Sequence, residues 1–458
     1  MNMSDQPPQP TKTRLSGWSG YLKEVSEINY VNKELIQEII ANNNEKYIAR
    51  GHGCSFGDQA ILKSGIVLST NRLKEIEWIT DEIISVESGV ELRELLSELL
   101  PRNKTLIGIP GGLQVTIGGA ISNNIHGKDH WKNGNFSENI VSVTFIDQDG
   151  TKHKVSKKDE VFKYLVGGMG LFGLIISAEL KTHDIKSPWV REDTIRLNSK
   201  HDFEEFFTSI KSNTLDVDYA VAWLDFSNKK HLGRGIALTG KFIEGKKVTK
   251  KYVEEKTEFN KYVFNYFHHN YFWTIARPFY RRPILNSLSL MKYKLTKQVS
   301  SSDIFYTDYM WIDNKLIPEY RKIYKPKNFI EIQPLISTSD GYDKFFALLD
   351  YLKLNHLEPL FPSVKIHKEH ESLWTFAGNG LSICIDIPVA RKNFTKTVNE
   401  LYEFLIDIDA RIYLAKDSTL DKKYTNKLAP GFNELIVKSN ELGFSNKFDS
   451  DMAKRLTD

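Results

Sequence analysis

Three glycine-rich segments near the N-terminus constrain this chain more than any other feature. They are "RGHGCSFGD" at 50–58, "GIPGGLQVTIGGAISNNIHG" at 108–127 and "GGMGLFG" at 167–173, each beside a predicted strand or helix start. Glycine lets a backbone approach a bound group closely and adopt conformations denied to other residues. Thr116 is the predicted N-cap of a short helix, whose free amides near Gly118 suit a diphosphate. Three such turns in one region predict a binding site for phosphate groups.

Segments typical of strands and helices alternate along this region. "KYIAR" and "GIVLS" are short apolar runs typical of strands, and "ELRELLSELL" has leucines at helical spacing. The Asp149-Gly150 pair between two β-rich runs predicts a hairpin. Glycine becomes rarer and charge rises near residue 187, where we place a domain boundary. Beyond it, strands separated by helices predict an antiparallel sheet flanked by helices, and thus an α+β fold with two domains.

The composition excludes several classes of protein. A net charge of +4 with a pI near 8.6 is too mild for a nucleic-acid-binding surface. Two cysteines, Cys54 and Cys384, make no disulfide framework and are typical of a reducing compartment. The polar residues 1–13 are predicted to be a disordered tail rather than a signal peptide. Since no apolar run approaches the ~18 residues of a spanning helix, we expect a cytoplasmic protein with at most peripheral contact at the inner membrane face.

Residues 262–280 carry nine aromatic side chains among histidines and arginines. The ordinary interpretation of such a segment is a core helix or packing between domains. The alternative is a mobile lid or a peripheral membrane patch. The sequence leaves both open.

Polar residues that follow the second glycine segment form another candidate feature. His126 and His130 have the i, i+4 spacing of metal ligands on a helix, but a glycine between them disfavours a continuous helix. We therefore interpret His126 and Lys128 as the polar wall of a pocket and expect no metal site. Further on, alternation in "LSICIDIPV" places Cys384 opposite the isoleucines, and Lys416 follows the strand-like "RIYLA".

Several motifs together resemble a known family. "GHGCSFGD", "PGGLQVTIGGAISNNIHGKDHW", "NIVS" and "GGMGLFGLI" are similar to the PCMH-type FAD-binding domain of the vanillyl-alcohol oxidase superfamily. "RLSGW", "IHGKDHW", "VKIHK", "CIDIPV", "YLAKDS" and "SDMAKRL" narrow the resemblance to the decaprenylphosphoryl-ribose oxidase family. This resemblance implies an FAD-binding domain at 14–187, a substrate-binding domain at 188–411 and a return of the chain to the first domain at 412–458.

The resemblance also implies which residues surround the cofactor and the substrate. Residues that match the lining of FAD are Gly51, His52, Gly53, Cys54, Ser55, Gly111, Gly112, Thr116, Gly118, Gly119, Ser122, Gly170, Ile175 and Tyr413. Residues that match the substrate pocket are Phe56, Gln333, Lys365 and Cys384, and those implied as catalytic are His126, Lys128 and Lys416.

Some positions depart from the family pattern. The wider superfamily often links its flavin through a histidine in the first glycine turn, where this chain has Cys54. We therefore expect noncovalent FAD, with a thioether from Cys54 as the alternative. Phe56, Met169 and Glu331 stand where the close family often has tyrosine, asparagine and glutamine, which leaves the fine substrate preference open.

The implied reaction is oxidation of a secondary hydroxyl, the ribose 2-hydroxyl, on a polyprenyl-phosphate sugar. Hydride would pass to the flavin, Lys416 with a pKa lowered by burial would accept or relay the hydroxyl proton, and His126 and Lys128 would orient the hydroxyl. A nicotinamide-dependent keto-sugar reductase would be the partner that completes an epimerisation in arabinofuranose synthesis for the cell wall. The alternatives are a sugar-lactone or carbohydrate oxidase that uses oxygen and a catalytically silent flavin-binding subunit.

Overall fold

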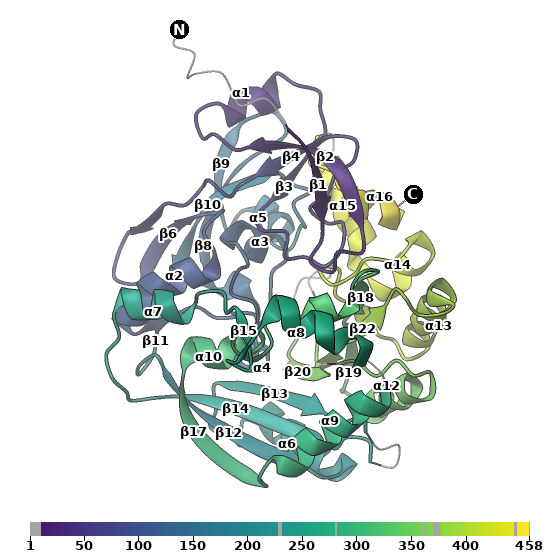
Figure 1. Cartoon of the computed structure of the whole chain (residues 1–458). Coiled ribbons are helices and arrows are strands. Elements are labelled where there is room, and N and C mark those ends of the chain that lie inside the picture. Colours follow the sequence, from purple (N-terminus) through teal and green to yellow (C-terminus); the bar gives the residue numbers. More distant parts are fainter. Residues whose placement is uncertain are drawn as a thin grey trace.

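The computed structural model describes residues 11–457 except 228–230, 280–281, 361, 370–375, 377 and 444–446. An N-terminal part with two sheets lies above one larger sheet in Figure 1, and helices from the end of the chain lie along one side of their junction. The predicted α+β fold, with an antiparallel sheet in its second part, is confirmed.

The first four strands form a small mixed sheet in the order β1-β2-β4-β3. They are β1 (Thr11–Ser16), β2 (Lys23–Tyr30), β3 (Tyr47–Arg50) and β4 (Ile66–Ser69), with α1 (Ile36–Ala41) between β2 and β3. Thr11 to Thr13 lie in β1 and pair with Ile28 to Ser26 of β2. The predicted tail at 1–13 is therefore too long, because its last three residues gain strand partners. Residues 1–10 lie outside the described part.

A second, antiparallel sheet follows in the order β5-β6-β10-β8-β9. Its strands are β5 (Ile76–Trp78), β6 (Ile83–Glu87), β8 (Ile140–Ile146), β9 (Lys152–Ser156) and β10 (Leu174–Lys181), and a short pair joins β7 (Lys104–Thr105) to β11 (His183–Asp184). The predicted hairpin joins β8 to β9, and Gly150 has a φ of +79°, which favours glycine.

Short helices connect these strands and carry the second glycine segment. They are α2 (Leu92–Leu99), η1 (Leu100–Arg102), α3 (Ile117–Ser122), α4 (His130–Asn133), η2 (Phe136–Asn139) and α5 (Glu160–Leu165). The predicted cap of α3 is confirmed, since Thr116 Oγ1 accepts a hydrogen bond from Gly119 N at 3.3 Å. Ile117, Ala120 and Ile121 are fully buried, so the helix is held against the sheet by its apolar side.

Eight antiparallel strands form the large sheet in the order β17-β12-β14-β13-β20-β21-β19-β23. They are β12 (Trp189–Leu197), β13 (Tyr219–Leu224), β14 (Gly235–Ile243), β17 (Val299–Phe305), β19 (Pro334–Ser337), β20 (Ser363–His367), β21 (Gly380–Ile383) and β23 (Arg411–Ile412). The accompanying helices are α6 (Lys200–Lys211), α12 (Asp343–Leu354) and α13 (Phe394–Asp407). Phe203 of α6 stacks on Phe345 of α12 with ring centroids 5.5 Å apart, which joins both helices in one buried aromatic core.

Two chain segments pass from this sheet into a separate strand pair. β18 (Phe329–Ile332) pairs with β22 (Ile385–Pro388), and the next strands along each segment, β19 and β21, pair within the large sheet. Gln333 and Cys384 are the single residues between the paired stretches. We call this point the strand switch, and it brings both residues to the wall of the cavity described below.

A long excursion between β14 and β18 lies over the junction of the two parts. It contains α7 (Lys250–Lys256), β15 (Tyr262–Val263), β16 (Phe267–His268), α8 (His269–Ala276), η3 (Arg277–Phe279), α9 (Arg282–Leu295), α10 (Tyr306–Met310), α11 (Ile312–Leu316) and η4 (Tyr320–Tyr324). Figure 1 shows α8 in front of this junction and α9 beside the large sheet. No helix in the described ranges has the length and apolar character needed to cross a membrane.

The last helices contact the N-terminal part again. They are α14 (Lys422–Leu428), α15 (Gly431–Glu441) and α16 (Asp451–Thr457). Phe448 forms a parallel bridge with Tyr47 at the start of β3. Arg455 of α16 donates hydrogen bonds to Asp58 and to Asp417, at 2.6 and 2.9 Å, so one guanidinium joins the first glycine segment to the segment after β23.

Candidate active site

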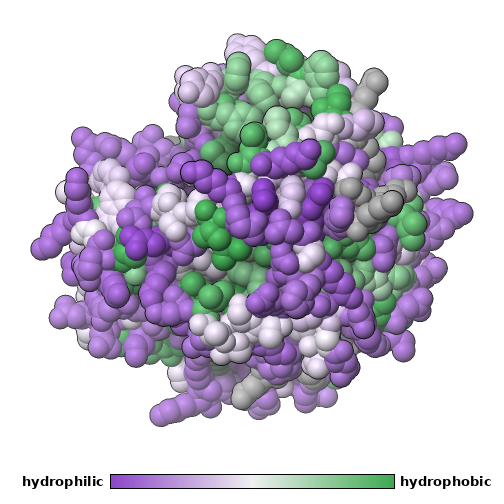
Figure 2. All heavy atoms as spheres, turned by 90° about the horizontal axis from the view of Figure 1, so that it is seen from below, coloured by the Kyte–Doolittle hydropathy of each residue, from purple (hydrophilic) through white to green (hydrophobic). Residues whose placement is uncertain are grey.

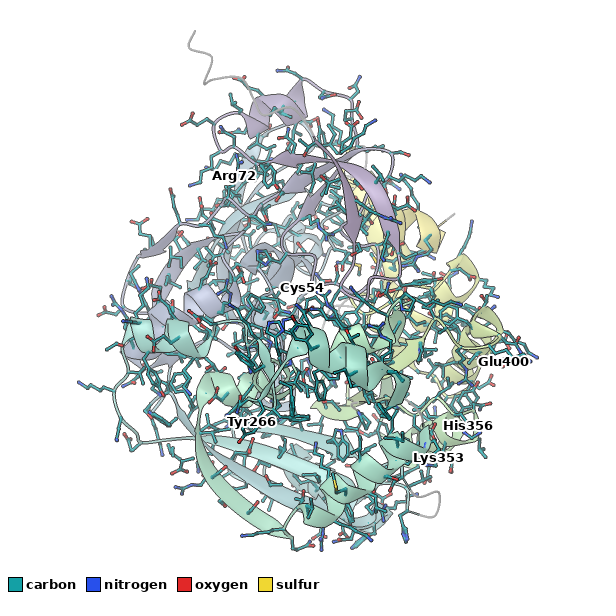
Figure 3. All side chains as sticks on the ribbon, viewed as in Figure 1. Cys54, Arg72, Tyr266, Lys353, His356 and Glu400 are labelled. Carbon is teal, nitrogen blue, oxygen red and sulfur yellow. The ribbon has the colours of Figure 1, made fainter. Side chains whose placement is uncertain are left out.

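A cavity of about 1310 Å³ lies where the N-terminal part meets the large sheet. Its wall comes from the loops after β3 and before α3 on one side, and from β13, β20 and the strand switch on the other. Cys54, labelled in Figure 3, lies in this wall near the middle of the molecule. Ligand pockets usually measure about 300–1,000 Å³, so this one has room for a cofactor and a second molecule.

Two glycine segments meet in the wall and differ in what glycine does there. A Cβ on Gly51 would fall 2.2 Å from Thr116 Oγ1, so glycine is required for the first turn to pack on the α3 cap. A Cβ on Gly111 would have only Met310 O within 4 Å, at 3.8 Å. Gly51 therefore serves the packing of the wall, and the space over Gly111 stays open to a ligand.

The third glycine segment lies at the edge of the cavity lining. Met169 and Ile175 line the cavity, and Gly170 does not. Gly170 has a φ of +83°, and a Cβ there would lie 3.1 Å from Ile48 Cδ1 of β3. The structure thus gives Gly170 a role in packing the turn against the small sheet, and its place in the cofactor site stays a prediction.

Polar atoms without partners lie in the same wall. Ser88 Oγ, Gln114 Oε1 and His126 Nδ1 are buried and have no hydrogen-bond partner among the described residues. Buried polar atoms in folded proteins are nearly always hydrogen-bonded, so these three fit a polar ligand in the cavity. Together with the glycine-lined surface, they fit a large cofactor that carries polar groups along its length.

A hydrogen-bonded chain leads from His126 and Gln333 in the cavity wall to Ser382 and His367, which do not line the cavity. Gln333 Nε2 lies 3.2 Å from His126 Nε2 and donates to Ser382 Oγ at 3.0 Å. His367 Nε2 lies 2.8 Å from the same hydroxyl, and the Tyr413 ring centroid is 4.9 Å from that of His126. Burial, reinforced by nearby Lys365, holds the pKa of His126 well below its usual range. His126 is therefore a neutral imidazole in a fixed orientation.

Lys128 is buried against the excursion. Its Nζ donates to Tyr309 O at 2.6 Å and lies 4.3 Å from the centroid of the Tyr309 ring. Burial, with Lys365 adding to the effect, lowers the pKa of Lys128 to about 8. Its ammonium is thus mostly protonated at pH 7 and has two further protons to donate to a ligand.

Lys416 is paired with a carboxylate that the site prediction did not include. Its Nζ lies 2.7 Å from Glu331 Oε1 and 3.8 Å from the centroid of the Phe56 ring. Burial alone would lower the pKa of Lys416, but Glu331 outweighs it and raises that pKa. The expected lowering of the Lys416 pKa is therefore wrong, because Glu331 stabilises the charged form.

A second carboxyl group lies beside the first. Glu331 of β18 and Asp386 of β22 are directly opposite in the antiparallel pair. Burial and Glu331 raise the pKa of Asp386 well above its usual range, while Tyr324 Oη donates to Asp386 Oδ2 at 3.0 Å. Lys416, Glu331 and Asp386 thus form one connected group, in which Asp386 favours its protonated form.

Both cysteines line the cavity as free thiols. Cys54 Sγ is 3.6 Å from Gln114 O, and burial, helped by Glu91, raises the pKa of its thiol to about 12. Burial also raises the pKa of Cys384. Neither thiol is activated, since a reactive cysteine needs a lowered pKa.

With the exception of Gly170, every predicted site residue lines this one cavity. Glu331, Asp386 and Asp313 line it too and were not among them. The sequence carried a signal for the first two, because Glu331 is two residues from Gln333 and Asp386 is two residues from Cys384, and residues two apart on a strand share a face. Asp313, in α11, has no such signal.

The histidines near α4 pack against one another. The ring centroids of His126 and His130 are 6.1 Å apart, and His367 lies within 5.0 Å of both. Within the part of the chain that the structure describes, no three His, Cys, Asp or Glu side chains are arranged to hold a metal ion.

The chain is similar to one known protein family and to several known proteins. The family described as FAD binding domain matches residues 33–156. Decaprenylphosphoryl-beta-D-ribose oxidase of Mycolicibacterium smegmatis is 24% identical over 459 residues, which cover 98% of each chain. Cytokinin dehydrogenase 2 of Arabidopsis thaliana is 24% identical over 39% of this chain and 37% of its own, and mitochondrial D-lactate dehydrogenase [cytochrome] 1 of Saccharomyces cerevisiae is 28% identical over 22% and 18%.

These similarities confirm the predicted cofactor and the general class of reaction. The matched range contains the first two glycine segments, which line the cavity, and the relatives are named as oxidases and dehydrogenases. The protein is an FAD-dependent oxidoreductase with an FAD-binding domain in its N-terminal part, and over its whole length it is similar to decaprenylphosphoryl-β-D-ribose oxidase.

Proposed function

We propose that the protein oxidises a secondary hydroxyl of a polyprenyl-phosphate sugar, the ribose 2-hydroxyl, to a keto sugar. The observation that carries this proposal is that one cavity joins a glycine-lined surface, the lysines Lys128, Lys365 and Lys416, and an apolar region. The resemblance to an enzyme named for a decaprenylphosphoryl ribose supports the choice of substrate.

The glycine-lined surface would hold FAD. The segments at 51–55 and 111–119 supply backbone amides and small residues, and Ser88, Gln114 and His126 supply unpaired polar atoms. When bound, FAD supplies the capacity to accept a hydride from an alcohol carbon. We propose noncovalent binding, because the Cys54 thiol, with a pKa of about 12, stays protonated and is a poor nucleophile.

The rest of the cavity suits a lipid-linked anionic sugar. Lys128, Lys365 and Lys416 bring cationic groups to one wall, where a phosphate and sugar hydroxyls find donors. The apolar residues of the lining that belong to β13, β14 and α9 are Val221, Ala222, Trp223, Leu224, Leu238, Ile284, Leu285, Leu288 and Met291, and Phe226 follows β13. An isoprenoid chain would bury its surface against these side chains.

Lys416 and Glu331 would move the proton of the substrate hydroxyl. Lys416 remains protonated beside Glu331, so its ammonium orients the hydroxyl oxygen rather than acting as a free base. As the hydride leaves the carbinol carbon, Lys416 takes the hydroxyl proton while its own proton passes to Glu331, 2.7 Å away. His126, neutral and fixed by Gln333, would hold the sugar in place.

Conversion of the keto sugar into the epimer of the original sugar requires reduction by a second enzyme. A nicotinamide-dependent reductase that delivers hydride to the other face of the carbonyl would invert the carbon, and we propose such a reductase as the partner in arabinofuranose formation for the cell wall. The similarity to decaprenylphosphoryl-beta-D-ribose oxidase supports this step, which lies outside the chain itself.

An anaerobic titration of the purified holoenzyme tests the proposal. Acid precipitation should release the flavin into the supernatant, and a polyprenyl-phosphoribose should bleach the flavin absorbance of the native protein. Lys416→Met should bleach at least about a hundredfold more slowly. The matched control is Lys422→Met, an exposed lysine on the same C-terminal segment, which should bleach normally.

Each other outcome points to a different function. Bleaching by soluble sugars alone, with peroxide formed in air, would identify a carbohydrate oxidase. A flavin that neither substrate reduces would identify a silent flavin-binding subunit.

A further inference from the structure

We propose that the excursion formed by β15, β16, α8 and α9 docks on the surface of a bilayer that contains anionic lipids. The bilayer would then lie against the mouth of the cavity. This inference rests on surface composition and exposure, and it holds or fails independently of the reaction proposed above.

Large apolar side chains point outward along this excursion. Tyr266, at the turn between β15 and β16 and labelled in Figure 3, is 82% exposed, and Tyr271 and Ile275 of α8 are 73% and 68% exposed. The other exposed apolar residues of this region are Phe259, Tyr262, Phe264, Phe267, Phe279, Ile284, Leu288, Met291 and Leu295. Seen from below, most of the surface is hydrophilic, and a group of apolar residues projects at its upper edge (Figure 2). Many exposed apolar side chains in one segment of a protein indicate a site of interaction.

The excursion is anchored by its inner side, so its outer side chains are free of the core. Val263 is fully buried, and Trp273 Nε1 donates to Pro318 O at 2.7 Å. Lys322 Nζ donates to Asn270 Oδ1 at 2.7 Å, and Phe264 N donates to Leu316 O at 2.8 Å. These bonds fix the backbone. The exposed Phe264 and Phe267 rings contact Phe272 on one side, and about half of each side chain remains exposed.

The charge of this region favours an anionic membrane over a protein as its partner. From Phe259 to Ser302 the sequence contains seven Lys or Arg and no Asp or Glu, although the whole chain has a net charge of only +4. Lys261, Lys294 and Lys297 are exposed among the aromatic residues. Aromatic side chains combined with lysines, and without acidic residues, are typical of surfaces that lie in the headgroup layer of anionic membranes.

The exposed surface continues into the cavity. Phe264, Phe279, Ile284, Leu288 and Met291 are more than one third exposed and also line the cavity. A lipid chain that leaves the bilayer at this surface would therefore stay in contact with apolar side chains until it enters the cavity. If the protein docks here, the lipid chain of the substrate can move from the bilayer into the cavity without being exposed to water.

Co-sedimentation of the FAD-loaded protein with vesicles tests the proposal. The protein should bind vesicles of phosphatidylcholine mixed with phosphatidylglycerol, bind phosphatidylcholine alone more weakly, and be released by salt. The triple variant Tyr266→Ser, Tyr271→Ser, Ile275→Ser should lose at least about tenfold in partition coefficient. Lys261→Gln with Lys294→Gln should lose about fivefold per lysine on the anionic vesicles only.

Controls separate docking from misfolding and from other partners. None of the three serine positions lines the cavity, so flavin content and thermal unfolding should match the wild type. Leu354→Ser removes a 72% exposed leucine at the end of α12 and should leave vesicle binding unchanged. Failure of the wild type to bind either vesicle, or equal binding by the triple variant, would overturn the proposal. A concentration-dependent dimer that the triple variant abolishes, without vesicle binding, would assign the surface to a second copy of the chain.

Discussion

Lys416 Nζ lies 2.7 Å from Glu331 Oε1, and Glu331 in turn is the cross-strand neighbour of Asp386. The three side chains come from three separate strands or turns of the second half of the chain. Lys416 is therefore not an isolated lysine, because the Glu331 carboxylate stabilises its charged form.

Glu331→Gln should slow flavin reduction by the sugar lipid about a hundredfold at neutral pH, because the proton from Lys416 loses its acceptor. The same change removes the group that raises the pKa of Lys416. The remaining activity should therefore increase with pH, as Lys416 loses its own proton and serves as the base. Anaerobic stopped-flow reduction across a pH series measures both effects.

Glu331→Asp keeps a carboxylate and should recover part of the rate. Wild-type reduction by Glu331→Gln at neutral pH would remove Glu331 from the proton path.

Lys128 should make substrate affinity depend on pH. Its pKa is about 8, below the ordinary value, so it loses its charge as pH rises from 7 to 9. If its ammonium binds the anionic substrate, KM should rise about tenfold over this range while the maximal rate changes little. Lys128→Arg stays charged throughout and should give a KM that does not vary with pH. A pH-dependent KM in that variant would assign the titration to another group.

Two glycine variants should separate fold from cofactor binding. Gly111→Ala adds a Cβ with only one atom within 4 Å, so the unfolding free energy should stay the same while FAD affinity falls. Gly51→Ala forces a Cβ against Thr116 and should lower stability by about 1–3 kcal/mol as well. Urea unfolding of the apoprotein and fluorescence titration with FAD measure the two quantities. Unchanged FAD affinity in Gly111→Ala would mean that the cofactor does not approach this turn.

Arg455→Met should destabilise the protein by about 3 kcal/mol, because it leaves the buried carboxylates of Asp58 and Asp417 without their shared cation. Lys454→Met, next to it and paired only at 3.6 Å with Asp449, should cost no more than about 1 kcal/mol. Chemical denaturation of both variants gives the comparison. Equal midpoints would show that the C-terminal helix is held by its apolar contacts alone.

Local features of the site could be predicted from the sequence, and long-range pairings could not. The Thr116 cap and the hairpin at Gly150 depend on residues a few positions apart, so composition and spacing are sufficient. The Lys416–Glu331 pair depends on which strands lie next to each other, which no local pattern specifies. The role of Gly170 is open to two interpretations for a related reason, because a glycine with positive φ serves packing as readily as ligand binding.

The structure of the aromatic segment at 262–280 could not be predicted from its sequence either. Its sequence allowed both a buried helix and an exposed surface, since aromatic side chains are common in both. The structure shows both environments in this segment: Trp273 is buried, and Tyr271, two positions earlier, is exposed. Only the three-dimensional arrangement decides which face of a short helix meets the rest of the protein.

At the strand switch, the side chains that shape the cavity lie outside the backbone pairing that stabilises the sheets. Gln333 and Cys384 belong to neither run of paired residues, and the Gln333 carbonyl accepts a hydrogen bond from Tyr413 N at 3.1 Å. A change of side chain at either position therefore leaves the backbone pairing of both sheets in place, although a change at Gln333 also removes its side-chain contacts with His126 and Ser382. Two side chains of the cavity wall can thus vary on an unchanged backbone, and related enzymes with other substrates would be expected to differ there first.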